Sequence, residues 1–247
     1  MSIGVAISTY NRQRHLNDLL DTLPHDKIDQ LVIVKDGGGS KYNSPPVGEF
    51  IEMVGNHGVA TSKNVGLAML MKCKHDHMFL LDDDVVVKDD DVFNMYIETA
   101  CQTGVYHLLF SKINNNQLLH STDHIDLHAQ CQGAFMYIHR GVINNVGDFD
   151  QRYYNAYEHI DFYYRCVLKG LVPKFWFFPD AHGSENFLMD HPDNISTIFG
   201  NNLNSDNLNR STNYFTNKHG KFVNSIPAEP LSAVLQDMDR IKQLYSR

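Results

Sequence analysis

Short apolar runs alternate with helix-like periodicity over the first 84 residues, and this alternation is the strongest constraint on the fold. Strand-like runs precede and follow two segments in which apolar residues recur every 3.6 positions. The strand-like runs lie at 3–9, 31–34, 50–54 and 78–81, and the helical patterns at 16–23 and 59–71. Such alternation predicts right-handed crossovers and a parallel sheet with helices on both faces.

The second half of the chain is less regular. We expect strands at 105–111, 132–138 and 174–178, and helices at 157–168 and 231–244, the last beginning after Pro230. Residues 200–224 contain eight asparagines and little periodicity, so we expect a mobile loop there.

The charge and cysteine content exclude several classes of protein. The net charge of −8 disfavours a generally basic nucleic-acid binder. The four cysteines form no CxxC pair, which argues against zinc-ribbon and thioredoxin motifs. No apolar stretch approaches the roughly 20 residues of a membrane span, and the first 20 residues lack the apolar core of a signal peptide. We therefore expect a cytoplasmic protein without a membrane span.

Polar residues whose side chains can bind a ligand or take part in a reaction follow three of the expected strands. They are Thr9–Arg12, Asp36 and Asp82–Asp84. Parallel α/β sheets bind ligands beyond the carboxyl ends of their strands. The three groups should therefore meet at one ligand site.

Three adjacent carboxylates repel one another unless a cation neutralises them. In an extended chain Asp82 and Asp84 point to one side and Asp83 to the other, so the pair can hold a divalent ion and a neighbouring hydroxyl. A solvated acidic turn is an equally good explanation of the local sequence.

Other candidates lie on expected helices and loops. Lys63 and Asn64 open a buried helix where a phosphate or ribose can be held. Glu158 and Asp161 share a helix face, and with His159 they offer groups able to deprotonate a hydroxyl. The acidic side chains are explained equally well as partners of the helix dipole. His182 stands beside a glycine in a loop and can offer an imidazole to a metal.

Taken together, the pieces resemble the inverting glycosyltransferases of family 2, which have the GT-A fold. The resemblance covers about residues 1–185 and rests on seven segments in order: Ser8–Arg12, Asp36–Gly39, Asn56–Gly66, Leu80–Asp84, Gly133–Phe135, Val146–Asp150 and Glu158–Arg165. It implies a single GT-A type α/β domain with a Rossmann-like half, a mixed sheet and a C-terminal helical extension. It also implies a nucleotide-sugar donor, with a UDP-sugar expected first, a carbohydrate or other hydroxyl acceptor, and Mn²⁺ or Mg²⁺.

The resemblance also assigns roles to residues. Thr9, Tyr10 and Asp36 would contact the nucleobase and ribose, Asp82 the ribose or donor sugar, and Asp84 the metal, with His182 as its second protein ligand. The expected donor site also contains Asn11, Arg12, Lys63, Asn64 and Asp83.

Two positions depart from the family pattern. Lys63 stands where many members have arginine, and the usual Glu-Asp pair is Glu158-His159. The second residue of that pair often serves as the base. Here the base can be Asp161, Glu158 or His159, and we rank the two carboxylates slightly above the imidazole.

This interpretation divides the chain into a nucleotide-sugar-binding half (1–110), an acceptor-binding and catalytic half (111–199), and a loop with a C-terminal helix (200–247). It predicts a metal-dependent hexosyl- or pentosyltransferase that inverts the anomeric centre. Three alternatives stay open: a sugar-nucleotide nucleotidyltransferase, a carbohydrate-binding module, and a transferase that glycosylates a modified base in DNA.

Overall fold

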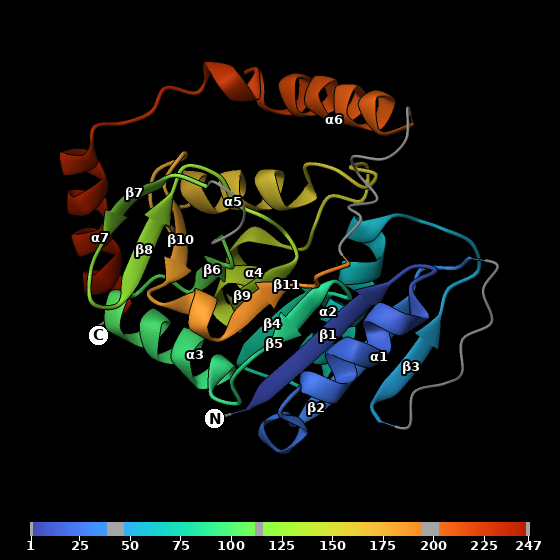
Figure 1. Cartoon of the computed structure of the whole chain (residues 1–247). Helices are drawn as coiled ribbons and strands as arrows, with labels where there is room; N and C mark the ends of the chain where they lie inside the picture. The colour runs from blue at the N-terminus through green and yellow to red at the C-terminus, as the bar shows by residue number, and fades with distance from the viewer. Residues whose placement is uncertain (1, 39–46, 112–115, 194–202, 246–247) are drawn as a thin grey trace.

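A six-stranded mixed sheet forms the centre of the computed structural model, which describes residues 2–38, 47–111, 116–193 and 203–245 (Figure 1). The strand order is β3-β2-β1-β4-β9-β6. β1 to β4 are parallel, and β9 runs antiparallel to both β4 and β6. The strands are β1 (Ile3–Thr9), β2 (Gln30–Lys35), β3 (Glu49–Glu52), β4 (His77–Asp82), β6 (His107–Leu109) and β9 (Phe135–His139). The alternating pattern thus correctly predicted the parallel half.

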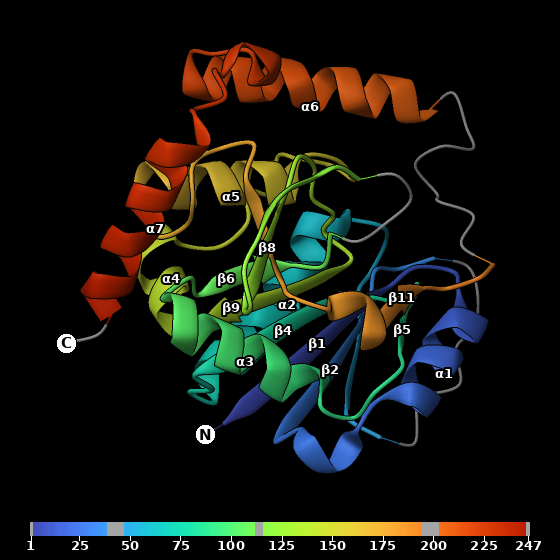
Figure 2. The same ribbon diagram turned by 60° about the vertical axis from the view of Figure 1, so that its left-hand side comes forward.

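Two small antiparallel sheets flank the central one. β5 (Val85–Val87) pairs with β11 (Leu188–Asp190), and β8 (Ile125–His128) lies between β7 (Leu118–Ser121) and β10 (Phe178–Ala181). The α-helices are α1 (Gln13–Thr22), α2 (Val59–Lys72), α3 (Val92–Thr103), α4 (Arg140–Val146), α5 (Glu158–Leu168), α6 (Leu203–His219) and α7 (Leu231–Tyr245). Figure 2 shows α6 lying across one end of the molecule, over α5.

Close packing of α2 on β1 brings a helix start to the edge of the sheet. A Cβ atom built on Gly66 would lie 2.6 Å from the Cβ of Ala6, so only glycine allows this approach. The N-terminus of α2 therefore lies next to the residues that follow β1 and β2.

The expected strand at 174–178 is wrong, because the strand β10 begins only at Phe178. Trp176 has a φ of 74°, in the left-handed region, which interrupts an extended chain. Its indole Nε1 donates a hydrogen bond of 2.7 Å to the carbonyl of Ile226. The aromatic run is core packing rather than a strand.

The mobile loop expected at 200–224 is also wrong over most of its length, because residues 203–219 form α6; residues 200–202 lie outside the described part. The sequence of α6 lacks an apolar stripe because few of its side chains pack in the core. Phe215 is one of those that do. Polar contacts hold the helix instead, and Tyr214, Lys218 and His219 reach acidic side chains on the body of the protein.

In the described parts of the chain, no helix combines the length and the apolar character needed to cross a bilayer.

Candidate active site

A cavity of about 860 Å³ lies at the carboxyl ends of β1, β2 and β4. Its volume lies within the range of small-molecule sites. The residues expected to share one site do meet there: Thr9, Tyr10, Arg12, Asp36, Asp82, Asp84, Glu158 and His159 all line it.

The acidic triplet has the expected sidedness, although β4 ends at Asp82 and the chain forms a turn at Asp83 and Asp84 instead of staying extended. Asp82 and Asp84 line the cavity, whereas Asp83 is fully buried and accepts a hydrogen bond of 2.6 Å from Thr9 Oγ1. Arg12 pairs with Asp83 and, at 3.0 Å, with Asp84 Oδ2. The contacts of Asp83 with Thr9 and Arg12 therefore hold the triplet in place. Thr9 and Arg12 use part of their hydrogen-bonding capacity in these contacts.

Burial makes Asp82 and Asp83 costly to ionise. Burial raises the pKa of Asp82 to about 6 against the opposing effect of Lys63, with Asp84 and Glu158 raising it further. Burial likewise raises the pKa of Asp83 to about 7, against Arg12 and Thr9. A bound cation would relieve both effects.

Asp84 and Asp190 offer the open oxygens that a hard cation needs. Asp84 Oδ1 is buried and has no hydrogen-bond partner among the described residues. Asp190, at the end of β11, also lines the cavity, and its pKa is raised by burial and by the charge of Asp84. These carboxylates fit Mn²⁺ or Mg²⁺, which prefer oxygen ligands and share them with phosphates. No three metal-ligating side chains form a ready-made cluster among the described residues, so phosphate oxygens would have to complete such a site.

Asp36 is positioned by the helix start on α2. Its two carboxylate oxygens accept hydrogen bonds of 2.8 Å from the backbone N–H groups of His57 and Gly58. Burial raises the pKa of Asp36, while these N–H groups favour its charged form. Asp36 therefore presents a fixed acceptor to the cavity, close to the half-exposed Tyr10 ring.

Lys63 is buried behind the cavity instead of projecting into it. Its Nζ donates 2.6 Å to the carbonyl of Gly133 and lies 3.2 Å from Asp82 Oδ1 and 3.7 Å from Glu158 Oε1. It therefore joins the end of β4 to the start of α5. This geometry does not place Lys63 in direct contact with a phosphate in the cavity.

Two expected donor contacts do not reach the cavity. The Asn64 amide exchanges two hydrogen bonds with the backbone of Phe149, at 2.8 and 2.9 Å, so it joins α2 to the loop before α5. Asn11 has a φ of 55° and packs against Gly38, outside the cavity lining.

Glu158 and His159 form a dyad at the start of α5. His159 Nδ1 lies 3.1 Å from Glu158 Oε1, and because a carboxylate can only accept, Nδ1 is the donor. Burial opposes ionisation of Glu158, but His159 and Lys63 lower its pKa to about 2. Glu158 is thus a weak base, and the Nε2 of His159 is left to act as an acceptor.

Asp161 does not line the cavity, which corrects its place among the expected bases. It is fully buried outside the cavity lining and pairs with Lys218 at 2.7 Å, His219 at 2.8 Å and Arg165 at 2.8 Å. Burial opposes its ionisation, yet these partners lower the pKa of Asp161. Lys218 and His219, which lie in the segment expected to be a mobile loop, are occupied by this carboxylate.

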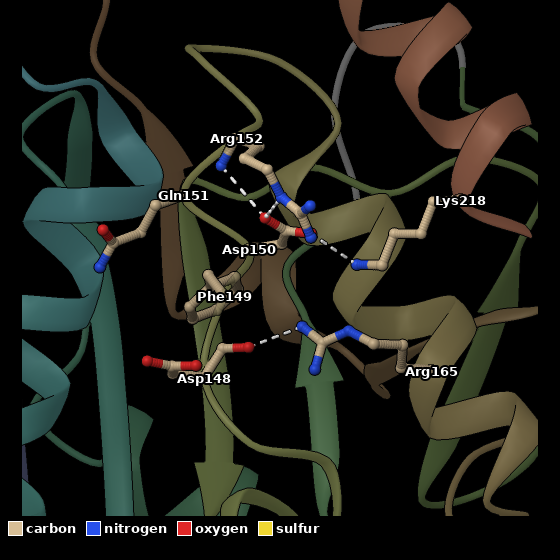
Figure 3. Close-up of a pocket in the computed structure, with 7 residues that line it drawn as sticks. All are labelled: Asp148, Phe149, Asp150, Gln151, Arg152, Arg165 and Lys218. Atoms are coloured by element: carbon tan, nitrogen blue, oxygen red, sulfur yellow. Dashed lines mark hydrogen bonds and ion pairs between the residues drawn. The ribbon is translucent and has the colours of Figure 1, made fainter.

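Figure 3 shows the neighbouring pocket of about 480 Å³, which Arg152, Arg165 and Lys218 line. Arg152 and Lys218 pair with Asp150, and Arg165 donates to the backbone carbonyls of Val146 and Asp148. These cations bind carboxylate and carbonyl oxygens of the protein itself, so the contacts in this pocket connect the region of α5 to α6.

His182 is not beside Asp84, contrary to its expected role as second metal ligand. Its Nδ1 lies 3.0 Å from Asp126 Oδ1, its side chain is 51% exposed, and it lies outside the cavity lining. His191 stands near Asp84 instead, donating its backbone N–H to the Asp84 carbonyl at 2.8 Å. Both ring nitrogens of His191 have partners, Asp18 at 3.0 Å and the N–H of Asp193 at 3.1 Å.

Sequence reasoning missed Asp190, His191 and residues 130–132, all of which line the cavity. Asp190 is the last residue of a three-residue strand that has no visible pattern of its own, and His191 follows it. Their pairing with β5, directly after the acidic triplet, brings them to the site. No local signal in the sequence could have found them.

Comparison with known proteins supports the same fold. No model of a known protein family matches the sequence. A protein of Acanthamoeba polyphaga mimivirus described as an uncharacterized glycosyltransferase is 27% identical over 213 residues, which are 77% of this chain and 82% of the relative. The structure of GalNAc-T7 with UDP, GalNAc and Mn²⁺ matches 67% of this chain with a TM-score of 0.52 and 10% identity. TarS of S. aureus (1–349) matches 67% with a TM-score of 0.47 and 14% identity.

The chain spans 40% of the GalNAc-T7 chain and 55% of the TarS chain. The expected GT-A type α/β fold, with its mixed sheet, is confirmed by the strand order and by the likeness to GalNAc-T7. The sequence itself is similar to that of a viral glycosyltransferase.

Proposed function

We propose that this protein is a metal-dependent, inverting glycosyltransferase that moves a sugar from a nucleotide-sugar donor to a hydroxyl acceptor. The observation that carries the proposal is the meeting, in one cavity, of a braced acidic triplet and a Glu158–His159 dyad. The first group suits a diphosphate with its cation, and the second suits an incoming hydroxyl.

The donor would lie along the carboxyl ends of β1, β2 and β4. Asp36 presents a fixed acceptor for an N–H of the nucleobase, and Tyr10 offers a ring for stacking. Asp82, held by Lys63, would accept from a sugar hydroxyl. UDP-sugars are the first donors to test, since GalNAc-T7 was solved with UDP.

Asp84 and Asp190 are the residues we propose to hold Mn²⁺ or Mg²⁺. Asp84 Oδ1 lacks a described hydrogen-bond partner, and Asp190 lines the same cavity within range of the charge of Asp84. When bound, the cation would neutralise the charge that develops on the departing diphosphate.

The dyad supplies the base. His159 Nε2 would take the proton of the acceptor hydroxyl as its oxygen attacks the anomeric carbon, and the bond from that carbon to the diphosphate breaks. Glu158, held as an anion by Lys63, keeps the imidazole in the tautomer whose Nε2 accepts. Attack opposite the leaving group inverts the anomeric centre.

The test is donor hydrolysis by the purified protein with Mn²⁺, across a panel of UDP-, GDP- and dTDP-sugars. Release of the nucleoside diphosphate from at least one donor, lost with EDTA and restored by Mn²⁺, is the expected result. Release of pyrophosphate from a nucleoside triphosphate plus a sugar phosphate, without donor hydrolysis, would instead identify a nucleotidyltransferase. Proton NMR of the transferred sugar then reports its anomeric configuration.

A further inference from the structure

The acceptor end of the cavity is built from neutral amides, whereas the donor end is acidic. Five carboxylates line the cavity, and Arg12, already paired with Asp83 and Asp84, is the only lysine or arginine in its described lining. The carboxylates are Asp36, Asp82, Asp84, Glu158 and Asp190. An acceptor that brings its own negative charge would meet repulsion and no described unpaired cation.

The segment 130–132 lies beside the dyad. A Cβ atom on the next residue, Gly133, would be 3.1 Å from His159 Nδ1 and 3.2 Å from Glu158 Oε1. Burial and the charge of Glu158 raise the pKa of the Cys131 thiol, so this side chain is also neutral. Residues 130–132 line the same cavity as His159, so an acceptor bound at the imidazole would have the rest of its molecule within reach of this segment.

The backbone of this segment is held at both ends. Asn116 donates 2.7 Å to the carbonyl of Gln130 and accepts 3.1 Å from its N–H. At the other end, Lys63 binds the carbonyl of Gly133 at 2.6 Å, and the carbonyl of Ala134 accepts 2.8 Å from the N–H of Asp82. The side chains between these anchors are presented from a fixed support, which lowers the entropy lost on binding.

Gln130 and Gln132 carry the free hydrogen-bonding groups. Both residues are exposed and line the cavity, and neither side-chain amide bonds to a described residue. A primary amide both donates and accepts, which matches the hydroxyl groups of a polyol. We infer that Gln130 and Gln132 form an acceptor subsite that selects an uncharged, polyhydroxylated molecule such as a neutral sugar, and disfavours phosphorylated acceptors and DNA.

This inference rests on the proposed function, and donor hydrolysis separates the two. The probes are methyl glucoside, galactoside and mannoside, the corresponding hexose 6-phosphates, and a DNA duplex that contains 5-hydroxymethylcytosine. With the donor that is hydrolysed, we expect kcat/KM for the best neutral glycoside to exceed that for every anionic probe by about 100-fold or more.

The variants Gln130→Ala and Gln132→Ala should each raise the acceptor KM by about tenfold and change the rate of donor hydrolysis by much less. Gln132→Lys should improve the use of the hexose 6-phosphates by about tenfold, because it adds the missing cation. Gln102→Ala, exposed on α3 outside the cavity, is the matched control and should change neither quantity.

Absence of donor hydrolysis with every nucleotide sugar would refute the proposed function itself. Given hydrolysis, three results overturn the inference alone. They are equal or better transfer to an anionic probe, transfer to none of the neutral glycosides, and an acceptor KM that neither glutamine substitution changes.

Discussion

His159 Nδ1 lies 3.1 Å from Glu158 Oε1, so two consecutive residues at the start of α5 form one hydrogen-bonded unit. Asp161, which shares the helix with them, is turned away and binds α6. We therefore propose the reverse of the sequence-based ranking, with the imidazole of His159 as the base and Glu158 as the residue that orients it.

Removing the base should abolish transfer without abolishing donor binding. We expect His159→Ala to lower kcat by about 10²- to 10⁴-fold, and Glu158→Gln by about tenfold or more, because glutamine lacks the charge that holds the tautomer. Isothermal titration with the nucleoside diphosphate and Mn²⁺ should give an unchanged Kd. His182→Ala removes a matched imidazole, paired with Asp126 outside the cavity, and should retain full activity. Normal transfer by His159→Ala would show that the base lies elsewhere.

Metal dependence should be lost at Asp84 and weakened at Asp190. Asp84→Asn should lower kcat by orders of magnitude, since a neutral amide coordinates poorly and several kcal/mol of transition-state stabilisation disappear (about 1.4 kcal/mol for each tenfold). Asp190→Asn should raise the Mn²⁺ concentration for half-maximal activity by about tenfold or more. The control is Asp239→Asn, on the exposed side of α7. Activity of Asp84→Asn that persists in EDTA contradicts the assignment.

Asp161 should contribute to stability far more than a surface ion pair does. Its neutral replacement Asp161→Asn leaves Lys218, His219 and Arg165 crowded around a buried amide, which we expect to cost about 3–5 kcal/mol of unfolding free energy. Asp193→Asn breaks an exposed pair with Arg14 and should cost at most about 1 kcal/mol. Urea denaturation measures both values, and equal losses of unfolding free energy would show that Asp161 does not anchor α6.

A buried histidine should make the protein less stable in acid. Burial lowers the pKa of His107 to about 4, and its Nδ1 bonds to the carbonyl of Tyr137 at 3.0 Å. Because the pKa is lower in the folded state than the ordinary 6.5, stability is complete above pH 6.5 and falls as the pH drops toward 4. We expect a loss of about 2 kcal/mol between pH 7.5 and pH 5.

The same urea titrations on His107→Asn isolate this effect. The asparagine can still donate to Tyr137 but does not titrate in this range, so the difference between variant and parent removes the contribution of other titrating groups. Parallel pH profiles for the two proteins would contradict the assignment to His107.

Gly133 should be required for the geometry of the dyad. An alanine Cβ there would crowd His159 Nδ1 at 3.1 Å and Glu158 Oε1 at 3.2 Å, so Gly133→Ala should lower kcat by about tenfold while donor affinity is kept. Gly141→Ala meets His139 Nδ1 at the same 3.1 Å distance, away from the cavity, and serves as the control. If both variants keep full kcat, the dyad tolerates displacement and the prediction is wrong.

The sequence by itself determined the parallel half of the sheet and the edge at which the site lies. Strand and helix periods are local properties, and the carboxyl ends of parallel strands share one edge, so Thr9, Asp36 and Asp82 were brought together by topology alone. The expected separation of Asp83 from Asp82 and Asp84 is also found, although a turn at Asp83 and Asp84 produces it and not an extended chain.

Only the tertiary structure decided which polar groups face the cavity and which serve the fold. Helix periodicity places Glu158 and Asp161 near one another, but it does not say that Asp161 meets Lys218 and His219 from a helix some 50 residues later. α6 itself is held by those distant carboxylates, so its own sequence has little helical pattern to read. Likewise, Asp190 reaches Asp84 only because β11 pairs with β5. These contacts join segments far apart in the chain, and burial and charge compensation between such segments leave no periodic signal in either one.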